Sequence, residues 1–286
     1  MSESSPGTLY LVATPIGNLS DISSRAIQTL TSVDFIAAED TRVTRKLLEH
    51  LSIKKPTVSY YRHNSRKSGD KIVLRIQSGE SCALVTDAGT PGISDPGEDL
   101  VRLCADVDVP MIVIPGPCAA VSALSLSGLD AGRFTFEGFL SATGKSRLEH
   151  LNELLTERRT MVFYEAPHKL IRTLTDMLEV FGDRRISISR ELTKIYEETL
   201  RFTIAEALTH FSKEQPRGEF VLIVEGDKSI LDPSVCVDDA VVAAVAYING
   251  GLSVKDAVKQ ASNETGVPKN ILYNSVIAVS DKKEHE

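Results

Sequence analysis

The sequence predicts an α/β protein with two α/β domains and a small helical domain at the C-terminus. In the first half, short apolar strands alternate with helical patterns, which is typical of a mostly parallel sheet covered on both faces. In the second half the strands have fewer and longer connections, which indicates a mixed sheet. After Gly226 only helical patterns follow. We therefore expect domains over residues 1–128, 129–229 and 235–286, with the first break near Gly128.

In the first domain, apolar runs and amphipathic patterns follow one another in order. Strands are expected over residues 8–13, 33–38, 57–61, 82–86 and 111–114. Helices are expected over residues 21–30, 41–51, 70–77, 100–104 and 119–126. Gly79 and Gly128 are typical helix stops. The helix at 119–126 begins with small residues, which permit either tight packing or close approach of a ligand.

In the second domain, strands and helices are expected in mixed order, and in the C-terminal tail only helices are expected. Strands are expected over residues 133–140, 160–164, 185–189, 199–203 and 220–224, with helices ending at Thr156 and over 167–180 and 205–211. Asp-Pro-Ser at 232–234 indicates a linker, and helices are expected over 238–247, 254–263 and 270–279. The pattern of helices separated by short turns in this tail is typical of a helix–turn–helix motif, which would suit contact with RNA. An ordinary helical hairpin explains the pattern nearly as well.

Composition restricts the class of protein. With 286 residues and 42% hydrophobic content, the chain can bury a core and form about two domains. No apolar run approaches the roughly 18 residues of a membrane span, and the N-terminus lacks a signal pattern, so we expect a cytoplasmic protein. The cysteines lack metal spacing and are expected to be buried free thiols: Cys82, Cys104, Cys118 and Cys236.

The most informative motif is the loop Asp-Ala-Gly-Thr-Pro-Gly-Ile-Ser-Asp-Pro-Gly at residues 87–97. Its small residues would let a ligand approach the backbone, and it follows a strand, where open α/β sheets bind ligands. Asp95 fits a helix N-cap, Pro96 the first helical position and Glu98 the return partner of a capping box. An ordinary turn is the alternative, but the acid at its mouth and the related loop at 14–18 favour a binding site.

Acidic residues end other predicted strands. Glu39 and Asp40 follow one strand, and Glu165 and Glu191 end two more. Each could be an active-site group, and Asp40 or Thr41 could equally cap the next helix. Convergence of several such groups on one cleft would be hard to explain by capping alone.

Basic residues are concentrated in one part of this acidic chain, whose net charge is −7. Between Arg42 and Arg75 there are ten bases and two acids, which predicts a positive surface. Tyr60 and Tyr61 would add stacking groups. The candidate RNA-binding residues are Arg45, Lys46, Arg62, His63, Asn64, Arg66 and Lys67. Solvated helix faces are the alternative explanation.

Several common motifs are missing from the sequence. It contains neither GxGxxG nor GxxxxGK[ST], and neither HExxH nor GxSxG. The histidines do not cluster at metal-ligand spacings, so no metal site is expected.

Seven motifs recur in the order known from one family. They are Thr-Pro-Ile-Gly-Asn-Leu at 14–19, Ala-Ala-Glu-Asp-Thr-Arg at 37–42, Asp-Ala-Gly-Thr-Pro at 87–91, Pro-Gly-Pro-Cys-Ala-Ala at 115–120, Phe-Tyr-Glu-Ala-Pro-His at 163–168, Arg-Glu-Leu-Thr-Lys at 190–194 and Gly-Glu-Phe-Val-Leu-Ile-Val-Glu-Gly at 218–226. Together they resemble the small-subunit ribosomal RNA cytidine 2′-O-methyltransferases of the tetrapyrrole methylase superfamily. The resemblance covers about residues 8–226, and the tail resembles that family's C-terminal helical domain.

The resemblance implies a two-domain tetrapyrrole-methylase-like fold with S-adenosylmethionine folded in the cleft between the domains. It further implies a homodimer that methylates the 2′-hydroxyl of a cytidine in the decoding region of 16S rRNA, on the small ribosomal subunit. One alternative is a tetrapyrrole (precorrin-type) C-methyltransferase, whose polycarboxylate substrate would also suit basic residues. Another is a non-catalytic RNA-binding protein that holds a small effector in its cleft.

The family's cofactor contacts carry over onto matching positions of this sequence. They are Pro15, Asp87, Ala88, Gly89, Ile93, Cys118 and Ala119 in the first domain, and Tyr164, Glu165, Leu192 and Glu219 in the second. This chain departs from its relatives at Thr86, where serine is frequent, and both residues offer a hydroxyl. Gly92 lies at a position that varies.

Methyl transfer to oxygen is an in-line displacement, so alignment of donor and acceptor is the main task of the protein. A ribose hydroxyl is a poor nucleophile, and a positioned base would contribute roughly a hundredfold or more. We expect Glu39 or Asp40 to orient or deprotonate the hydroxyl while Arg42 holds an adjacent phosphate.

Overall fold

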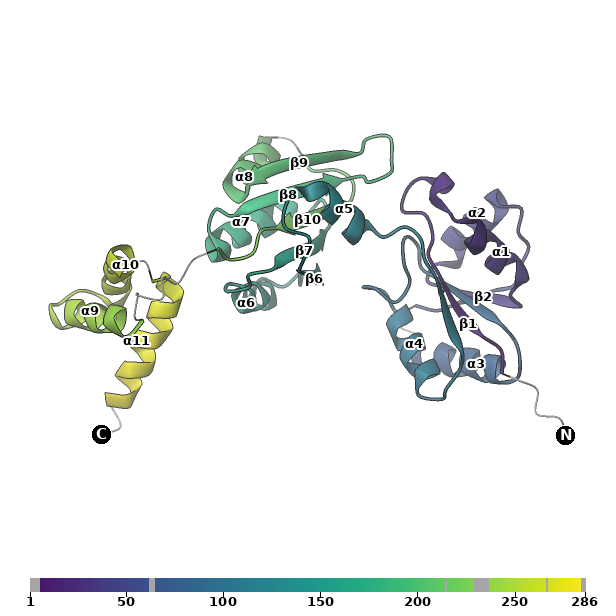
Figure 1. Ribbon diagram of the computed structural model, residues 1–286, viewed down its shortest axis with the longest axis horizontal. Helices are drawn as coiled ribbons and strands as arrows, with labels where there is room; N and C mark the ends of the chain where they lie inside the picture. Colours follow the sequence, from purple (N-terminus) through teal and green to yellow (C-terminus); the bar gives the residue numbers. More distant parts are fainter. Residues whose placement is uncertain (1–5, 62–64, 214, 229–236, 266, 284–286) are drawn as a thin grey trace. The chain divides into compact units, whose positions relative to one another are not determined.

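The computed structural model describes residues 6–61, 65–213, 215–228, 237–265 and 267–283. The chain forms two compact units, Met1–Asp227 and Lys228–Glu286, and the first unit contains two five-stranded sheets (Figure 1). Among the helices described, none has the length and apolar character to cross a membrane.

The first sheet is wholly parallel. Its strands are β1 (Leu9–Val12), β2 (Phe35–Ala38), β3 (Thr57–Ser59), β4 (Cys82–Val85) and β5 (Met111–Ile114), in the order β3-β2-β4-β1-β5. Its helices are α1 (Ser24–Ser32), α2 (Thr41–His50), α3 (Ser65–Gln77) and α4 (Gly97–Ala105), with a short 3₁₀ helix η1 (Leu19–Asp21). Alternate residues of β2 enter different cores: Phe35 packs with α3 and α4, whereas Ile36 packs with α1 and α2. The predicted parallel sheet covered on both faces is confirmed.

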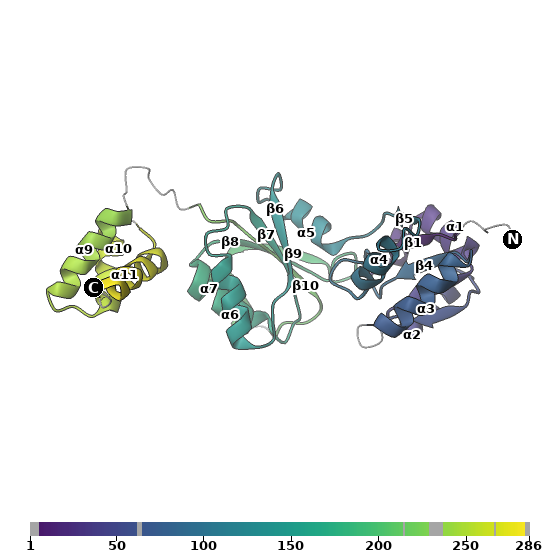
Figure 2. The same cartoon turned by 90° about the horizontal axis from the view of Figure 1, so that it is seen from below.

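The second sheet is mixed, as predicted. Its strands are β6 (Phe134–Phe139), β7 (Thr160–Glu165), β8 (Arg185–Arg190), β9 (Glu198–Thr203) and β10 (Phe220–Val224), in the order β6-β7-β10-β8-β9. Only β6 and β7 pair in parallel; the other pairs are antiparallel. Helices α6 (Gly144–Glu153), α7 (Leu170–Phe181) and α8 (Ile204–Lys213) cover one face, and α5 (Ala119–Ser127) covers the other. Figure 2 shows α6 and α7 on the side of the sheet opposite to α5.

Helix α5 packs on the second sheet. Ala123 and Leu124 lie in one apolar cluster with Val162, Val221 and Ile223, and Arg201 of β9 donates hydrogen bonds to the last carbonyls of the helix. The change of sheet therefore falls at residues 115–118, before α5, whereas the sequence analysis placed it after this helix. Gly128, with φ 72°, ends α5 in the left-handed region; a helix stop in the sequence does not reveal which sheet the helix covers.

The start of α4 differs from the predicted capping box. The helix begins at Gly97, and the Asp95 carboxylate accepts from the Gly97 amide (2.7 Å) and the Gly92 amide (2.9 Å). Glu98 instead accepts a hydrogen bond from Arg102 one turn later (2.7 Å), so the capping-box prediction is wrong.

The helix α3 begins at Ser65, five residues before the predicted start.

Three of the cysteines lie in the described part of the chain. Cys82, Cys104 and Cys118 are free thiols, and Cys236 lies outside the described residues. Cys82 and Cys104 are buried, and burial raises the pKa of the Cys104 thiol to about 11. These two cysteines are therefore core residues that stay protonated at neutral pH.

The second unit consists of α9 (Val237–Asn249), α10 (Val254–Thr265) and α11 (Lys269–Lys283). Ala240, Ala244, Val258 and Leu272 form its apolar centre. Ser253 precedes α10 and caps it, since its Oγ accepts from the Asp256 amide (3.2 Å). Three helices were predicted here; contact of this unit with RNA stays a prediction.

Candidate active site

Three loops at the carboxyl edge of the first sheet are held together by hydrogen bonds. The Thr14 and Gly89 main chains exchange two bonds (2.9 and 3.1 Å), which joins the loop after β1 to the loop after β4. Thr90 Oγ1 donates to the Pro117 carbonyl after β5 (3.1 Å). Gly89 has φ 86°, a conformation that favours glycine. The loops at 14–18 and 87–97, which are similar in composition, are thus also bonded to each other.

Loops of the second sheet face the same region. The Tyr164 hydroxyl accepts from the Ala120 amide at the start of α5 (3.2 Å), and burial raises the pKa of this phenol to about 12. The Phe136 and Phe139 rings lie 5.2 and 5.4 Å from the Tyr164 ring. The loop after β8 reaches the first domain, where Thr193 Oγ1 accepts from the Asn18 amide (3.1 Å).

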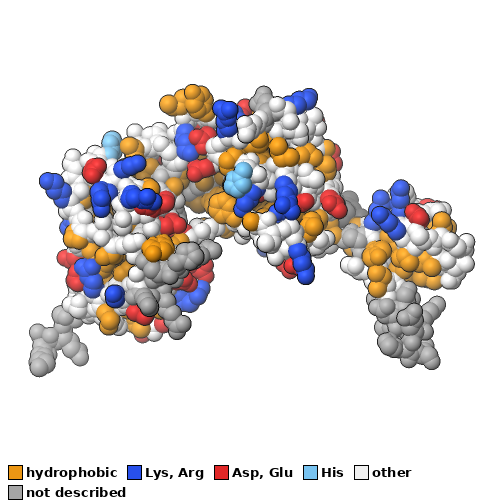
Figure 3. Space-filling view, turned by 180° about the vertical axis from the view of Figure 1, so that it is seen from behind, with side chains coloured by type: hydrophobic (Ala, Val, Ile, Leu, Met, Phe, Trp, Pro, Cys, Tyr) orange, Lys and Arg blue, Asp and Glu red, His pale blue; other side chains and the backbone are white. Residues whose placement is uncertain are grey.

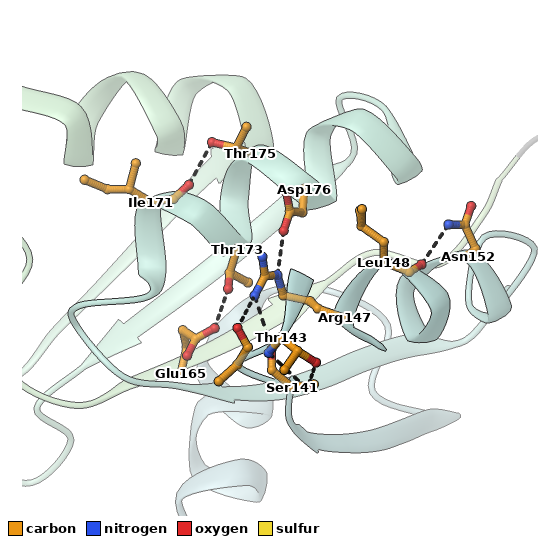
Figure 4. Close-up of polar contacts among 11 residues, drawn as sticks. Ser141, Thr143, Arg147, Leu148, Asn152, Glu165, Ile171, Thr173, Thr175 and Asp176 are labelled. Carbon is orange, nitrogen blue, oxygen red and sulfur yellow. Dashed lines mark hydrogen bonds and ion pairs between the residues drawn. The ribbon is translucent and has the colours of Figure 1, made fainter. Parts of the chain in front are cut away.

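Glu165 is buried at the end of β7, and each oxygen of its carboxylate accepts one hydrogen bond. One oxygen accepts from the Ala166 amide (2.8 Å) and the other from Thr173 Oγ1 of α7 (2.5 Å), as Figure 4 shows for Thr173. Both bonds hold the turn that follows the strand. Glu165 is therefore positioned to shape the site, and each carboxylate oxygen keeps a lone pair for a ligand.

Together these loops enclose a cavity of about 570 Å³. It brings together most of the predicted catalytic and cofactor residues. These are Glu39, Asp87, Ala88, Gly89, Ile93, Cys118, Ala119, Tyr164, Glu165, Leu192 and Glu219. Glu191 does not line the cavity; its carboxylate accepts from Lys194 Nζ (2.8 Å) and from the Glu219 amide (3.0 Å).

Three further predicted residues lie beside this cavity. Pro15 lines a smaller, neighbouring cavity. Asp40 and Arg42 line neither of the two and bind each other, with Arg42 Nη2 2.6 Å from Asp40 Oδ2. Asp40 also caps α2 by accepting from the Arg42 amide (2.8 Å). Its hydrogen bonds with Arg42 lower the pKa of the Asp40 carboxyl to about 2.

The predicted RNA-binding residues are distributed over several places. Arg45 is exposed on α2, and Lys46 lines the smaller cavity. Arg62, His63 and Asn64 lie outside the described residues, and Arg66 and Lys67 belong to α3 without described side chains. On the face shown in Figure 3, Lys and Arg side chains are interspersed with acidic ones.

Tyr60 is not a stacking group on the surface. Its side chain is 1% exposed and packs in the core with Ile72 and Ile76 of α3. That prediction is wrong, because Tyr60 follows β3 with its ring directed at α3, whereas the adjacent Tyr61 is 44% exposed. One step along an extended segment moves a side chain to the opposite face.

The cavity also contains residues that the sequence analysis did not select. Among them are Ile16, Thr86, Asp95, Phe139 and Val221. Asp95 was assigned only a capping role, although its place in the loop after β4 was a usable signal. Phe139 is 56% exposed at the end of β6, and no motif distinguished it from a core phenylalanine.

The charged side chains that line the cavity are predominantly acidic. Its acidic lining residues are Glu39, Asp87, Asp95, Glu165 and Glu219, and the described lining contains neither lysine nor arginine. Burial raises the pKa of Asp87 and of Asp95 above the ordinary value, which indicates that both carboxylates lack enough compensating partners. An acidic, partly apolar cavity favours a cationic ligand with apolar parts.

A family model described as Tetrapyrrole (Corrin/Porphyrin) Methylases matches residues 8–208. The chain belongs to this family. A relative from Synechocystis sp. is 44% identical, with 93% of this chain and 96% of that protein covered. For relatives from Bacillus subtilis and Escherichia coli O157:H7, identity is 45% and 42%, and each chain is covered by 95% or more. All three are named ribosomal RNA small subunit methyltransferase I.

Solved structures share the fold at much lower identity. Uroporphyrin-III-C-methyltransferase from Thermus thermophilus matches with a TM-score of 0.55 and 20% identity, covering 77% of this chain and 94% of that chain. Diphthine synthase matches with a TM-score of 0.59 and 13% identity, covering 77% and 90%. These likenesses show the tetrapyrrole methylase fold.

The family member described here is an S-adenosylmethionine-dependent methyltransferase, and its cavity fits that cofactor. When bound, the cofactor supplies a methyl group on a positively charged sulfur. The carboxylates of Asp87 and Asp95 suit this charge and the polar ends of the molecule, while Ile93 and Leu192 provide apolar walls. A Cβ atom at Gly89 would make only ordinary contacts, 3.5 Å from Ile16 Cγ2 and 3.7 Å from the Pro117 carbonyl oxygen, so it is the φ of 86° that favours glycine here.

Proposed function

We propose that the protein transfers a methyl group from S-adenosylmethionine to the 2′-hydroxyl of a cytidine in the decoding region of 16S rRNA. The substrate is the assembled small ribosomal subunit in the cytoplasm, and the enzyme is a homodimer. The observation that carries this proposal is the extent of similarity to proteins named for small-subunit rRNA methylation, 93% or more of the chain in each of the three relatives above.

The C-terminal unit supports the same assignment. The fold neighbours cover 77% of this chain, about the share that Met1–Asp227 makes up. The rRNA-methyltransferase relatives match too much of the chain to leave out all of Lys228–Glu286. A helical unit that accompanies rRNA-methylating relatives suits contact with the ribosomal subunit.

The geometry favours Glu39 over Asp40 as the group that orients or deprotonates the hydroxyl. Glu39 lines the cavity, and its Oε2 accepts from Thr86 Oγ1 (2.6 Å), which fixes the carboxylate. Asp40 is engaged by Arg42, and its low pKa makes it a weak base. In the proposed step Glu39 would take up the proton of the hydroxyl, and bound S-adenosylmethionine would supply the methyl group to the oxygen and leave as the neutral thioether.

Arg42 is the proposed phosphate contact. Its side chain is 85% exposed and is already oriented by Asp40. Because the described lining of the large cavity carries no lysine or arginine, phosphate groups of RNA would lie outside it, on α2. The same acidic lining argues against the polycarboxylate substrate of a tetrapyrrole C-methyltransferase.

The experiment incubates the protein with methyl-labelled S-adenosylmethionine and, separately, small ribosomal subunits, free 16S rRNA or a tetrapyrrole. We expect label on the assembled subunit, at the ribose of one cytidine when the RNA is digested to nucleosides. Label on the tetrapyrrole, or on a base, would overturn the proposal. Donor binding without transfer to any acceptor would instead support the non-catalytic alternative.

A further inference from the structure

A second cavity of about 220 Å³ adjoins the large one. It lies between the loop after β1 and helix α2, and Thr86 and Asp87 line both cavities. Thr86 is 8% exposed and is fixed on two sides, by its bond to Glu39 and by Thr14 Oγ1, which donates to the Thr86 carbonyl (3.2 Å). A group held in the small cavity would therefore contact residues that also line the proposed methyl-donor cavity.

One buried polar atom of this cavity has no explained role. Thr44 lines the cavity and is 3% exposed, and its Oγ1 has no hydrogen-bond partner among the described residues. A helical threonine commonly bonds to the carbonyl four residues earlier, but here the Asp40 carbonyl receives the Thr44 amide (3.0 Å) and no bond from the hydroxyl is formed. Buried hydroxyls are ordinarily paired, so an unpaired one on a residue in the wall of a cavity points to a polar ligand group.

Part of the wall is apolar, and two of its residues are exposed. Leu19 and Val43, at 43% and 40% exposure, line the cavity together with Pro15 and Leu47. Unpaired RNA bases are commonly held between apolar or aromatic walls and read by hydrogen bonds at their edges. The cavity has room for a single-ring base and none for a macrocycle.

Positive charge lies where the RNA backbone would pass. Lys46 lines the small cavity, and the exposed side chains of Arg42 and Arg45 lie on the same helix. The large cavity, in contrast, has acids and neither lysine nor arginine in its described lining, whereas in the small cavity Lys46 accompanies the shared Asp87. This separation assigns the cationic donor to one cavity and the phosphate-bearing acceptor to the other.

We propose that the small cavity binds an unpaired pyrimidine base of the RNA substrate, with the Thr44 hydroxyl bonded to the edge of the base. The attached ribose would then lie against Thr86 and Asp87, with its 2′-hydroxyl directed at Glu39 and the donor cavity. The inference rests on the proposed function and adds the location of base recognition to it.

Blocking the small cavity tests this assignment. Val43→Trp would fill the entrance, and Val107→Trp, at a similarly exposed valine after α4, is the matched control. We expect Val43→Trp to lower single-turnover methylation of small subunits at least a hundredfold, with S-adenosylmethionine affinity by calorimetry unchanged and Val107→Trp active. Normal methylation by Val43→Trp would overturn the inference, whereas absence of rRNA methylation by the unmodified protein would overturn the proposed function itself.

A subtler pair of variants tests the hydroxyl. Thr44→Val removes one hydrogen bond to the base and should lower kcat/KM about tenfold, while Thr44→Ser should retain activity. Because the hydroxyl is unpaired in the free protein, Thr44→Val should melt at the same or a higher temperature. A lower melting temperature with unchanged kcat/KM would show a purely structural role and contradict the inference.

Discussion

At the scale of single residues, the adjacent acids Glu39 and Asp40 occupy different surroundings. Glu39 faces the large cavity, whereas Asp40 caps α2 and binds Arg42. The sequence placed both after β2 but could not distinguish them, because the direction of each side chain depends on how the strand ends. The structure makes the distinction testable.

Glu39→Gln should lower the single-turnover rate of rRNA methylation about a hundredfold, since the amide cannot accept the hydroxyl proton. Asp40→Asn is the matched control, because asparagine also caps helices well; its rate should stay within a few-fold of the unmodified protein. Equal rates in both variants would eliminate Glu39 as the base. Donor affinity, measured by calorimetry, should be unchanged in Asp40→Asn, because Asp40 does not line the donor cavity.

Asp87 predicts a pH dependence of donor binding. Burial raises the pKa of its carboxyl, so the group takes up a proton at a higher pH than an ordinary aspartate, whose pKa is about 4. The charged form attracts the sulfonium, and affinity for S-adenosylmethionine should therefore fall as the pH is lowered through this raised pKa. Calorimetric titrations at decreasing pH measure the effect, and Asp87→Asn should flatten it. A profile that is the same in both proteins would contradict the assignment.

At the scale of elements, the ends of several strands could be predicted from the sequence. The elements against which a helix or side chain packs could not. The strands β5 and β10 have the predicted bounds, because both are short apolar runs between clear turn signals. Helix α5 was also predicted, but its packing on the second sheet depends on contacts with Val162 and Val221, distant in the sequence. The same holds for Tyr60, whose burial depends on α3.

The junction of α6 and α7 gives a prediction of stability. Arg147 is 3% exposed; its Nε donates to Asp176 Oδ2 (2.5 Å) and its Nη1 to the Ser141 carbonyl (3.1 Å), as Figure 4 shows. Arg147→Met would leave Asp176 with no cation, and breaking a buried pair costs about 3 kcal/mol or more of unfolding free energy. Urea denaturation measures the loss. Lys145→Met, on the same helix with an 89% exposed side chain, is the control and should change little.

At the scale of the whole molecule, the order of apolar strand patterns and helical patterns in the sequence was enough to predict the two sheets and the helical tail. The cavity could be predicted only as a convergence of motifs, because no local signal gives the distance between loops such as those at 14–18 and 87–97. Thr14 and Gly89 are 75 residues apart in the chain, and their two hydrogen bonds decide where the motifs meet.

The division into two units predicts the behaviour of a truncated chain. Among the residues that the structure describes, the apolar clusters of Met1–Asp227 include none from Lys228–Glu286, and the helical unit has its own cluster. A protein ending at Asp227 should fold and bind S-adenosylmethionine with affinity within a few-fold of the full chain. Its KM for small subunits should rise at least tenfold if the helical unit contacts the RNA. An unchanged KM would assign this unit a role other than substrate binding.

The acidic lining of the large cavity also bears on turnover. Transfer of the methyl group converts a sulfonium into a neutral thioether, so the spent cofactor loses the charge that Asp87 and Asp95 attract. The same carboxylates that favour loading therefore weaken retention of the by-product. The protein should discriminate between fresh and spent cofactor by charge, which limits inhibition by its own product.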